Sequence, residues 1–203
     1  MRLIADKIDC ERGGRRVFSD LSFTLGSGEG LLLTGANGSG KTSLLRLIAG
    51  LGDPAGGTFS IDGMDDDLAI GQRSHYVAHR NALKTALSVE ENLAFWAKFM
   101  GASDVAAGIE RGLGLFNLDH LASYSAGLLS QGQARRLALS RLELVARPIW
   151  LLDEPSVGLD EASCKQLAAA MNSHMDKGGL LIATTHTGLG VSFTKTIDMS
   201  EGA

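Results

Sequence analysis

The sequence is poor in cysteine, in positive charge and in long hydrophobic runs, and each shortage excludes a class of protein. Its two cysteines, Cys10 and Cys164, lie far apart without CxxC spacing, so we expect reduced thiols and neither a disulfide nor a metal site. The net charge of −4 gives no electrostatic reason to expect a nucleic-acid partner. No stretch approaches the roughly 18 apolar residues of a membrane-spanning helix. The first residues, 1–7, reach a charge before a secretory signal core could form.

Glycine, by contrast, is abundant. The chain of 203 residues contains 26 glycines against three prolines, and 44% of its residues are hydrophobic. This length and balance are typical of one globular domain with a sizeable core. The glycines are not spread as low-complexity sequence but gather at a few turns, and those turns hold the motifs that carry chemistry.

Strand-like runs alternate with helix-like runs, which is the pattern of an α/β protein. We expect strands at 15–25, 30–34, 58–62, 148–153 and 179–185, and helices at 41–49 and 161–175. From about residue 88 to 146 no convincing strand occurs, and apolar residues such as Val89, Leu93 and Trp96 recur at helical spacing. The sequence therefore predicts a single domain, with an α/β catalytic core of residues 1–87 and 147–203 and an inserted helical subdomain at about 88–146.

The first motif fits the phosphate-loop pattern G-x-x-x-x-G-K-[ST]. It comprises Gly35, Ala36, Asn37, Gly38, Ser39, Gly40, Lys41 and Thr42, and it follows an apolar run that ends at Thr34. Glycines let successive N–H groups face an anion, and the next helix points its positive N-terminus to the same place. Lys41 can then reach the β- and γ-phosphates of a nucleotide, and the Thr42 hydroxyl can ligate Mg²⁺. The alternative, a glycine turn with an incidental lysine, is disfavoured by the strand before the motif and the helix after it.

The second motif is an apolar run at 149–152 that ends in Asp153 and Glu154. Both carboxylates are expected at the C-terminal edge of a buried strand, where ligands bind in open α/β sheets. Asp153 would belong to the Mg²⁺ shell, through water, and Glu154 would orient and deprotonate the attacking water. Acidic turns often follow strands, so this motif is informative only together with the phosphate loop.

The third motif, Leu-Ser-Gln-Gly-Gln at 129–133, precedes a helix-like stretch at 134–146. Ser130 and Gln133 have the spacing of a capping box, which predicts Ser130 as the helix N-cap. The N–H groups and dipole of that helix would then point toward an anion. Taken alone, the motif is equally well explained as a well-capped helix.

Together these motifs resemble those of the nucleotide-binding subunits of ATP-binding-cassette (ABC) transporters, over essentially the whole chain. The family signature is Leu-Ser-Gly-Gly-Gln, and here Gln131 takes the third place. The resemblance implies a P-loop NTPase fold of α/β class, with a mixed-sheet core, an N-terminal antiparallel β region and an inserted α-helical subdomain. It implies ATP and Mg²⁺ as ligands and a head-to-tail dimer. In that dimer Ser130, Gly132 and Gln133 of one copy belong to the nucleotide site of the other.

The resemblance also assigns roles to three further residues. Asp160 belongs to the loop that links the two nucleotide sites, and His186 is the switch histidine, which contacts the γ-phosphate and positions the catalytic water. The family normally has a glutamine after the strand at 74–78, and this chain has His79. Histidine can still hydrogen-bond near the nucleotide, but the usual metal contact is in doubt. The usual adenine-stacking aromatic residue is absent from 10–14, where Arg12 is the candidate substitute.

Further details resemble the bacterial branch of the family that serves cytochrome c maturation, often called the haem exporter. They are the stretches 10–18, 84–93 and 128–139, His79 and the short chain. The resemblance implies a peripheral ATPase at the cytoplasmic face of the bacterial inner membrane, bound to an integral membrane transporter subunit through 80–87. We expect no direct haem binding, because the other histidines, His75, His120 and His174, show no ligand spacing.

Other functions stay open at this point. The chain could serve a different ABC transporter, or it could be a soluble ABC ATPase that acts on a cytosolic assembly. Soluble members usually carry two cassettes or long coiled-coil insertions, and this sequence has neither. A small-molecule kinase would also use a phosphate loop, but the signature, His186 and the lack of an obvious lid over an acceptor substrate disfavour it.

Overall fold

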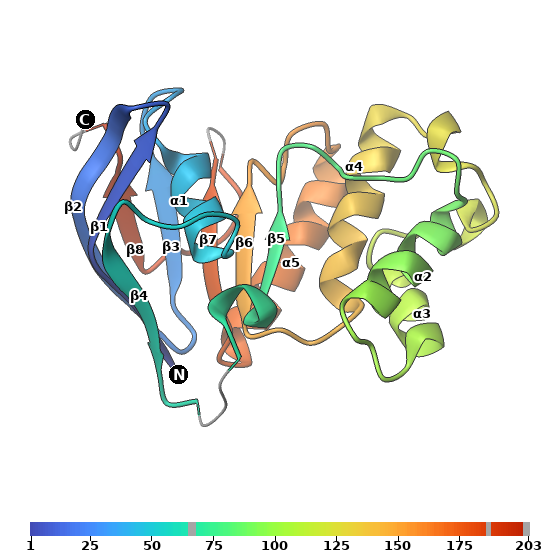
Figure 1. Cartoon of the computed structure of the whole chain (residues 1–203). Helices are drawn as coiled ribbons and strands as arrows, with labels where there is room; N and C mark the ends of the chain where they lie inside the picture. The colour runs from blue at the N-terminus through green and yellow to red at the C-terminus, as the bar shows by residue number, and fades with distance from the viewer. Residues whose placement is uncertain (65–67, 186–187, 201–203) are drawn as a thin grey trace. The chain divides into compact units, whose positions relative to one another are not determined.

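The computed structural model describes residues 1–64, 68–185 and 188–200. The α/β class is confirmed: an antiparallel sheet and a parallel sheet are combined with helices (Figure 1). The chain divides into two compact units. The core unit comprises Met1–Ala78, Arg147–Pro155 and Ala170–Ala203, and the helical unit comprises His79–Ala146 and Ser156–Ala169.

The antiparallel sheet of the core unit has three strands, in the order β2-β1-β4. Strand β1 spans Arg2–Arg12, β2 spans Arg15–Gly26 and β4 spans Gly56–Asp62. The strands predicted at 15–25 and 58–62 are confirmed. A two-residue turn joins β1 to β2, and Gly13 and Gly14 both have positive φ, at 57° and 74°, as a tight hairpin requires.

The second sheet is parallel throughout and has the order β5-β6-β7-β3-β8. Its strands are β5 (Ser74–Val77), β6 (Ile149–Asp153), β7 (Leu180–Thr184), β3 (Gly30–Thr34) and β8 (Lys195–Asp198). Every residue of β6 and β7 is buried, which explains why both strands are apolar up to their last residue, Asp153 in β6 and Thr184 in β7. Because the strands are parallel, their carboxyl ends share one edge, where Thr34, Asp153 and Thr184 lie.

Helix α1 (Lys41–Ile48) packs in the hydrophobic core of this unit. Its buried face meets apolar residues from both sheets; the set includes Leu44, Leu45 and Ile48 from the helix, Leu3, Ile8, Phe18 and Leu25 from the antiparallel sheet, and Leu31, Leu33, Leu151 and Ile182 from the parallel sheet. Burying a side chain of this size contributes about 1.5–3 kcal/mol. The residues that follow Thr34 are therefore fixed at both ends, by β3 and by α1.

The helical unit contains α2 (Val89–Phe99), α3 (Val105–Leu115) and α4 (Gln131–Ser140), with 3₁₀ turns η2 (Asp119–Leu121), η3 (Ala126–Leu128) and η4 (Arg141–Glu143). A further turn, η1 (Ile70–Arg73), belongs to the core unit. No strand occurs between residues 88 and 146, all of which are described, so the helical character predicted there is confirmed. Helix α3 lies close to Leu144, the residue after η4: a Cβ at Gly108 would lie 2.9 Å from the carbonyl oxygen of Leu144.

Helix α5 (Glu161–Asp176) precedes β7 and carries His174 in its last turn. The His174 ring stacks on Trp150 of β6, with centroids 4.2 Å apart and planes 10° apart. Its Nε2 lies 3.2 Å from the carbonyl oxygen of Leu180. His174 is thus half-buried against Trp150, and His75, on β5, is buried with 4% of its surface exposed. None of the described helices combines the length and the apolar character needed to cross a membrane.

His174 makes the stability of the fold depend on pH. Burial is the main cause that lowers the pKa of His174, so the folded protein binds fewer protons at this site than the unfolded chain. The stability from the neutral ring is present above the unfolded pKa of about 6.5 and is lost as the pH falls below it. Thermal unfolding from pH 8 to 5 should show a falling midpoint, and His174→Phe should flatten that dependence. His120→Phe, at an exposed position, is the control. An unchanged slope in His174→Phe would contradict this account.

Candidate functional site

Lys41 is the first residue of α1 and is only 8% exposed. Its Nζ donates hydrogen bonds to the carbonyl oxygens of Gly35, at 2.6 Å, and Ala36, at 3.0 Å. Among the described residues no carboxylate pairs with it. A buried ammonium group that only carbonyl dipoles neutralise attracts an anion.

The glycines of the loop adopt backbone conformations that other residues rarely reach. Gly35, Gly38 and Gly40 have φ of 121°, 88° and 102°. Gly40 is the N-cap of α1 and makes no side-chain capping bond, so the first N–H groups of this helix have no side-chain cap. The loop thus presents backbone donors and a helix N-terminus beside Lys41, which is the arrangement that binds phosphates.

Ser39 gives a second indication of a ligand. Its Oγ is buried and has no hydrogen-bond partner among the described residues. Its N–H donates to the carbonyl of Ala36, at 3.2 Å, so the residue is held by its backbone. Since buried hydroxyl groups nearly always have partners, an orphaned one in this loop fits a bound phosphate oxygen.

Asp153 lies at the end of β6 and is 3% exposed. Both of its carboxylate oxygens accept hydrogen bonds from threonines. The Thr42 hydroxyl donates to Oδ2 at 2.9 Å, and the Thr184 hydroxyl donates to Oδ1 at 2.9 Å. Together with burial, the charge of Asp153 raises the pKa of Tyr76, on β5, to about 12. The structure therefore brings Thr42 and Asp153, the two residues expected from the sequence to hold Mg²⁺, into direct hydrogen-bond contact.

Glu154 follows directly and has an unusual backbone, with a positive φ of 49°. This conformation costs a non-glycine residue about 1–3 kcal/mol and is often found at functional sites. Its N–H donates to the Thr184 hydroxyl at 2.9 Å. The same hydroxyl thus accepts from Glu154 and donates to Asp153, so Thr184 orients both acidic residues. Sequence reasoning missed Thr184; its signal was a threonine at the end of a buried strand directly before Thr185 and His186.

The signature segment lies in the helical unit and has the predicted cap. Ser130 is the N-cap of α4: its Oγ accepts from the N–H of Gln133 at 3.2 Å, while the Gln133 side chain accepts from the N–H of Ser130 at 2.9 Å. A Cβ at Gly132 would lie 2.9 Å from the carbonyl oxygen of Gly158, so the helix contacts the 156–160 loop closely. The capping box predicted from the sequence is confirmed.

The remaining site residues expected from the sequence lie on several different segments. Asp160 accepts the N–H of Ser163 at 2.8 Å, and this bond is the main cause that lowers its pKa. His79 is exposed and follows β5, and Arg12 is exposed at the end of β1. The Thr34 hydroxyl donates to the carbonyl oxygen of Ile197 at 3.4 Å. His186 lies outside the described residues.

Comparison with known proteins identifies the family to which the chain belongs. The profile of a family described as "ABC transporter" matches residues 18–157, which is most of the chain. This chain belongs to the ABC transporter family. It is an ATPase of that family, and ATP is its ligand.

Similar proteins are known by sequence and by structure. A "cytochrome c biogenesis ATP-binding export protein CcmA" from Bradyrhizobium diazoefficiens is 51% identical over 191 residues, covering 94% of each chain. A solved ATP-binding subunit of an ABC transporter is 28% identical, with a TM-score of 0.81 over 92% of this chain and 80% of that one. A dimeric post-hydrolysis state of an ATP-binding cassette with bound ADP and Pi is 21% identical and matches in fold, with a TM-score of 0.78 over 91% of this chain and 88% of that one.

Lys41→Ala should abolish tight ATP binding, because it removes the buried positive charge beside the loop glycines. Titration with a fluorescent ATP analogue measures this directly. Lys165→Ala is the matched control, since Lys165 forms only an exposed ion pair with Glu161 on α5, with side chains 76% and 83% exposed. Hydrolysis retained by Lys41→Ala would contradict the assignment of the site.

Thr184→Val should lower the turnover number by about tenfold or more, because two hydrogen bonds that position acidic residues are lost. ATP affinity should change much less, since Thr184 does not belong to the phosphate loop. Steady-state ATPase assays and nucleotide titration separate the two effects, and Thr184→Ser should recover most of the activity. A folded Thr184→Val protein with unchanged turnover would show that the hydroxyl does not position the acids.

Proposed function

We propose that this chain is the ATP-hydrolysing subunit of a membrane transporter complex that acts in c-type cytochrome biogenesis. The observation that carries the catalytic part is the hydrogen-bonded series Thr42, Asp153, Thr184 and Glu154 in the same unit as the buried Lys41. The biological part is supported by the name of the Bradyrhizobium relative, which is similar over nearly the whole chain.

The site residues would act on ATP as follows. The loop N–H groups from Asn37 to Thr42 hold the phosphates, and Lys41 exchanges its carbonyl partners for phosphate oxygens. Glu154 orients a water molecule and accepts its proton as the water attacks the γ-phosphorus, and the bond to the bridging oxygen breaks to release ADP. His186 would contact the γ-phosphate, and Arg12 would contact adenine.

Mg²⁺ is proposed to enter with the nucleotide. Thr42 and Asp153 would hold it, Asp153 through water, and the ion would supply charge neutralisation of the phosphates. In the described part of the chain no group of three or more histidine, cysteine or acidic residues could hold a metal by itself. The residues present fit a metal whose remaining ligands are phosphate oxygens and water. His79 is proposed as a sensor of the nucleotide in place of the usual glutamine.

A second copy of the chain is the proposed partner that completes the site. The chain has one phosphate loop and one signature segment, and a head-to-tail dimer would pair each loop with the Ser130, Gly132 and Gln133 of the other copy. Asp160 would lie between the two sites. The structural neighbour with bound ADP and Pi is a dimer, which supports this proposal by analogy of fold.

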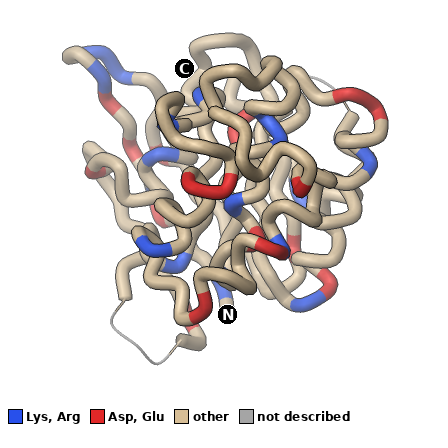
Figure 2. Tube along the Cα trace, turned by 90° about the vertical axis from the view of Figure 1, so that its right-hand side faces the viewer, with Lys and Arg blue, Asp and Glu red and all other residues tan. Residues whose placement is uncertain are grey.

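The other proposed partner is an integral membrane subunit, which would hold the ATPase at the cytoplasmic face of the bacterial inner membrane. The segment 80–87 is its candidate docking site. Asn92, which is fully buried, bonds both the N–H and the carbonyl of Lys84, at 2.8 and 3.0 Å, so this segment has a defined shape. Basic and acidic residues are interspersed along the trace (Figure 2), and the net charge is −4, which gives no support to a nucleic-acid partner.

Haem is proposed to be handled by other subunits. His75 is buried in the core unit, and the half-buried His174 ring is stacked on Trp150. An ATPase of another ABC transporter, or one acting on a cytosolic assembly, would have the same nucleotide site. The partner therefore decides between these functions.

The test is capture of the native complex by Glu154→Gln, which should bind ATP without hydrolysing it and so hold the complex together. The variant, with ATP, is used to recover partners from detergent-solubilised membranes of the source organism. Mass spectrometry and an absorption spectrum then identify proteins and haem. Small multi-span membrane proteins with haem-handling components are expected, and Lys41→Ala is the control that should recover less.

Two results would contradict the proposal in different ways. A different set of membrane proteins without haem components would keep the transporter role and remove the cytochrome c assignment. Soluble partners alone would favour the cytosolic assembly.

A further inference from the structure

The phosphate loop is held from behind by the residues that end strand β8. Among the described strands this edge strand pairs with β3 alone, in a register that places Asp198 beside Thr34. The next residue, Met199, donates its N–H to the Thr34 carbonyl at 3.0 Å and buries its side chain in the core. Ser200 then faces the loop, and its Oγ accepts the N–H of Ala36 at 3.1 Å. Its own N–H donates to Oδ1 of Asp198 at 2.8 Å.

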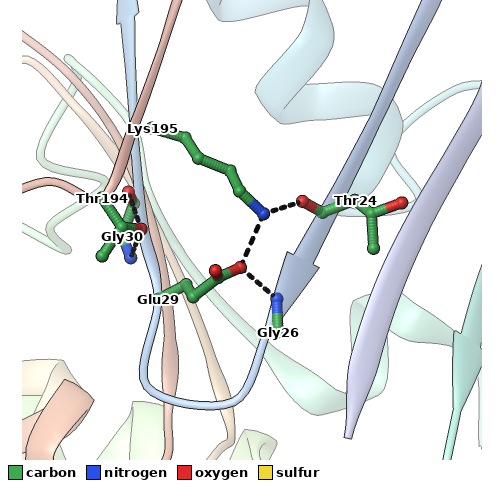
Figure 3. Close-up of polar contacts among 6 residues, drawn as sticks. All are labelled: Thr24, Gly26, Glu29, Gly30, Thr194 and Lys195. Carbon is green, nitrogen blue, oxygen red and sulfur yellow. Dashed lines mark hydrogen bonds and ion pairs between the residues drawn. The ribbon is translucent and has the colours of Figure 1, made fainter.

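The beginning of β8 is also held by hydrogen bonds, from Lys195 and from Thr194. Lys195 Nζ donates to Oε2 of Glu29 at 2.8 Å and to the carbonyl of Thr24 at 2.6 Å, as Figure 3 shows. The same Glu29 oxygen accepts the N–H of Gly26 at 2.6 Å, and these two partners lower the pKa of Glu29. The Thr194 hydroxyl accepts the N–H of Gly30 at 3.2 Å and donates to the Gly30 carbonyl at 3.0 Å. Strand β8 is therefore tied to β3 at both ends, which fixes the place of Ser200.

The contact between Ser200 and the loop is close. A Cβ at Gly35 would lie 2.9 Å from Ser200 Oγ, 2.9 Å from Ser39 Oγ and 3.1 Å from Asp198 Oδ1. The neighbouring Ala36 is held on both sides: Ser200 takes its N–H, and its carbonyl accepts from Lys41 Nζ and from the N–H of Ser39. The N–H that Ser200 accepts belongs to the peptide group between Gly35 and Ala36, and the carbonyl oxygen of that same group, Gly35 O, accepts from Lys41 Nζ at 2.6 Å.

We propose that Ser200, oriented by Asp198, is a positioning residue for ATP binding. It keeps the phosphate loop in its binding conformation before the nucleotide arrives, so that less of the binding free energy is used to order the loop. The proposal rests on the proposed role of Lys41 and the loop in holding the phosphates. It extends the nucleotide site to the strand after His186, which neither the motifs nor the family signature include.

The test compares Ser200→Ala with Ser200→Thr, which retains the hydroxyl, in the full-length protein. Loss of one hydrogen bond to the loop should raise KM and the dissociation constant for ATP about three- to tenfold. The turnover number should stay within about twofold, because Glu154 and Asp153 are untouched. Ser200→Thr, which keeps the hydroxyl, should bind ATP with an affinity close to that of the wild type.

A matched control separates this role from a general effect on stability. The Ser27 hydroxyl likewise makes one bond to the backbone elsewhere in the same unit, in this case as the donor to the carbonyl oxygen of Gly178 at 2.8 Å. Ser27→Ala should leave the affinity for ATP unchanged, and the thermal unfolding midpoints of both alanine variants are measured alongside. A KM in Ser200→Ala equal to that of the wild type and of Ser27→Ala would overturn the proposal. The proposed function itself would instead be overturned if the wild-type protein bound no ATP, or if Lys41→Ala bound ATP with the same affinity as the wild type.

Discussion

The structure of the site depends on the carboxylate of Asp153, which is buried and held on both oxygens by threonine hydroxyls. A buried charge without partners is strongly unfavourable, and these two bonds stabilise Asp153 at the end of β6. One partner, Thr42, begins the helix after the phosphate loop, and the other, Thr184, ends β7. The carboxylate therefore connects three elements at one edge of the sheet.

The phosphate loop lies at the same edge of the sheet and contributes a positive charge, whereas Asp153 contributes a negative one. Lys41 is buried as well, but its partners are carbonyl oxygens, so its positive charge is available to an anion. Three elements fix the conformation of the loop: β3 precedes it, α1 follows it, and the end of β8 bonds to it through Ser200. A loop fixed in this way can bind phosphate without first being ordered, which favours affinity.

The sequence predicted the parts of the fold in which local pattern and environment agree. The strand at Gly30–Thr34, the helix that begins at Lys41 and the capping box at Ser130 are found as predicted, because glycine, capping and apolar signals act over a few residues. No strand was predicted at Lys195–Asp198, since only four residues, mostly exposed, pair there with β3. Thr184 and Ser200 were missed for a related reason: each acts through partners far away in the chain, and a threonine or a serine has no distinctive sequence pattern.

We propose that ATP is hydrolysed at the edge of the parallel sheet where Asp153 and Glu154 lie, and that Glu154, whose N–H is held by Thr184, orients the attacking water. The measurement that tests it most directly is single-turnover hydrolysis of bound ATP by the wild-type protein and by Glu154→Gln, with nucleotide binding recorded in the same samples. The variant should bind ATP as the wild type does and cleave it about 10²-fold to 10⁴-fold more slowly, the range for loss of a general base. Cleavage by a correctly loaded Glu154→Gln protein at the wild-type rate would contradict this proposal.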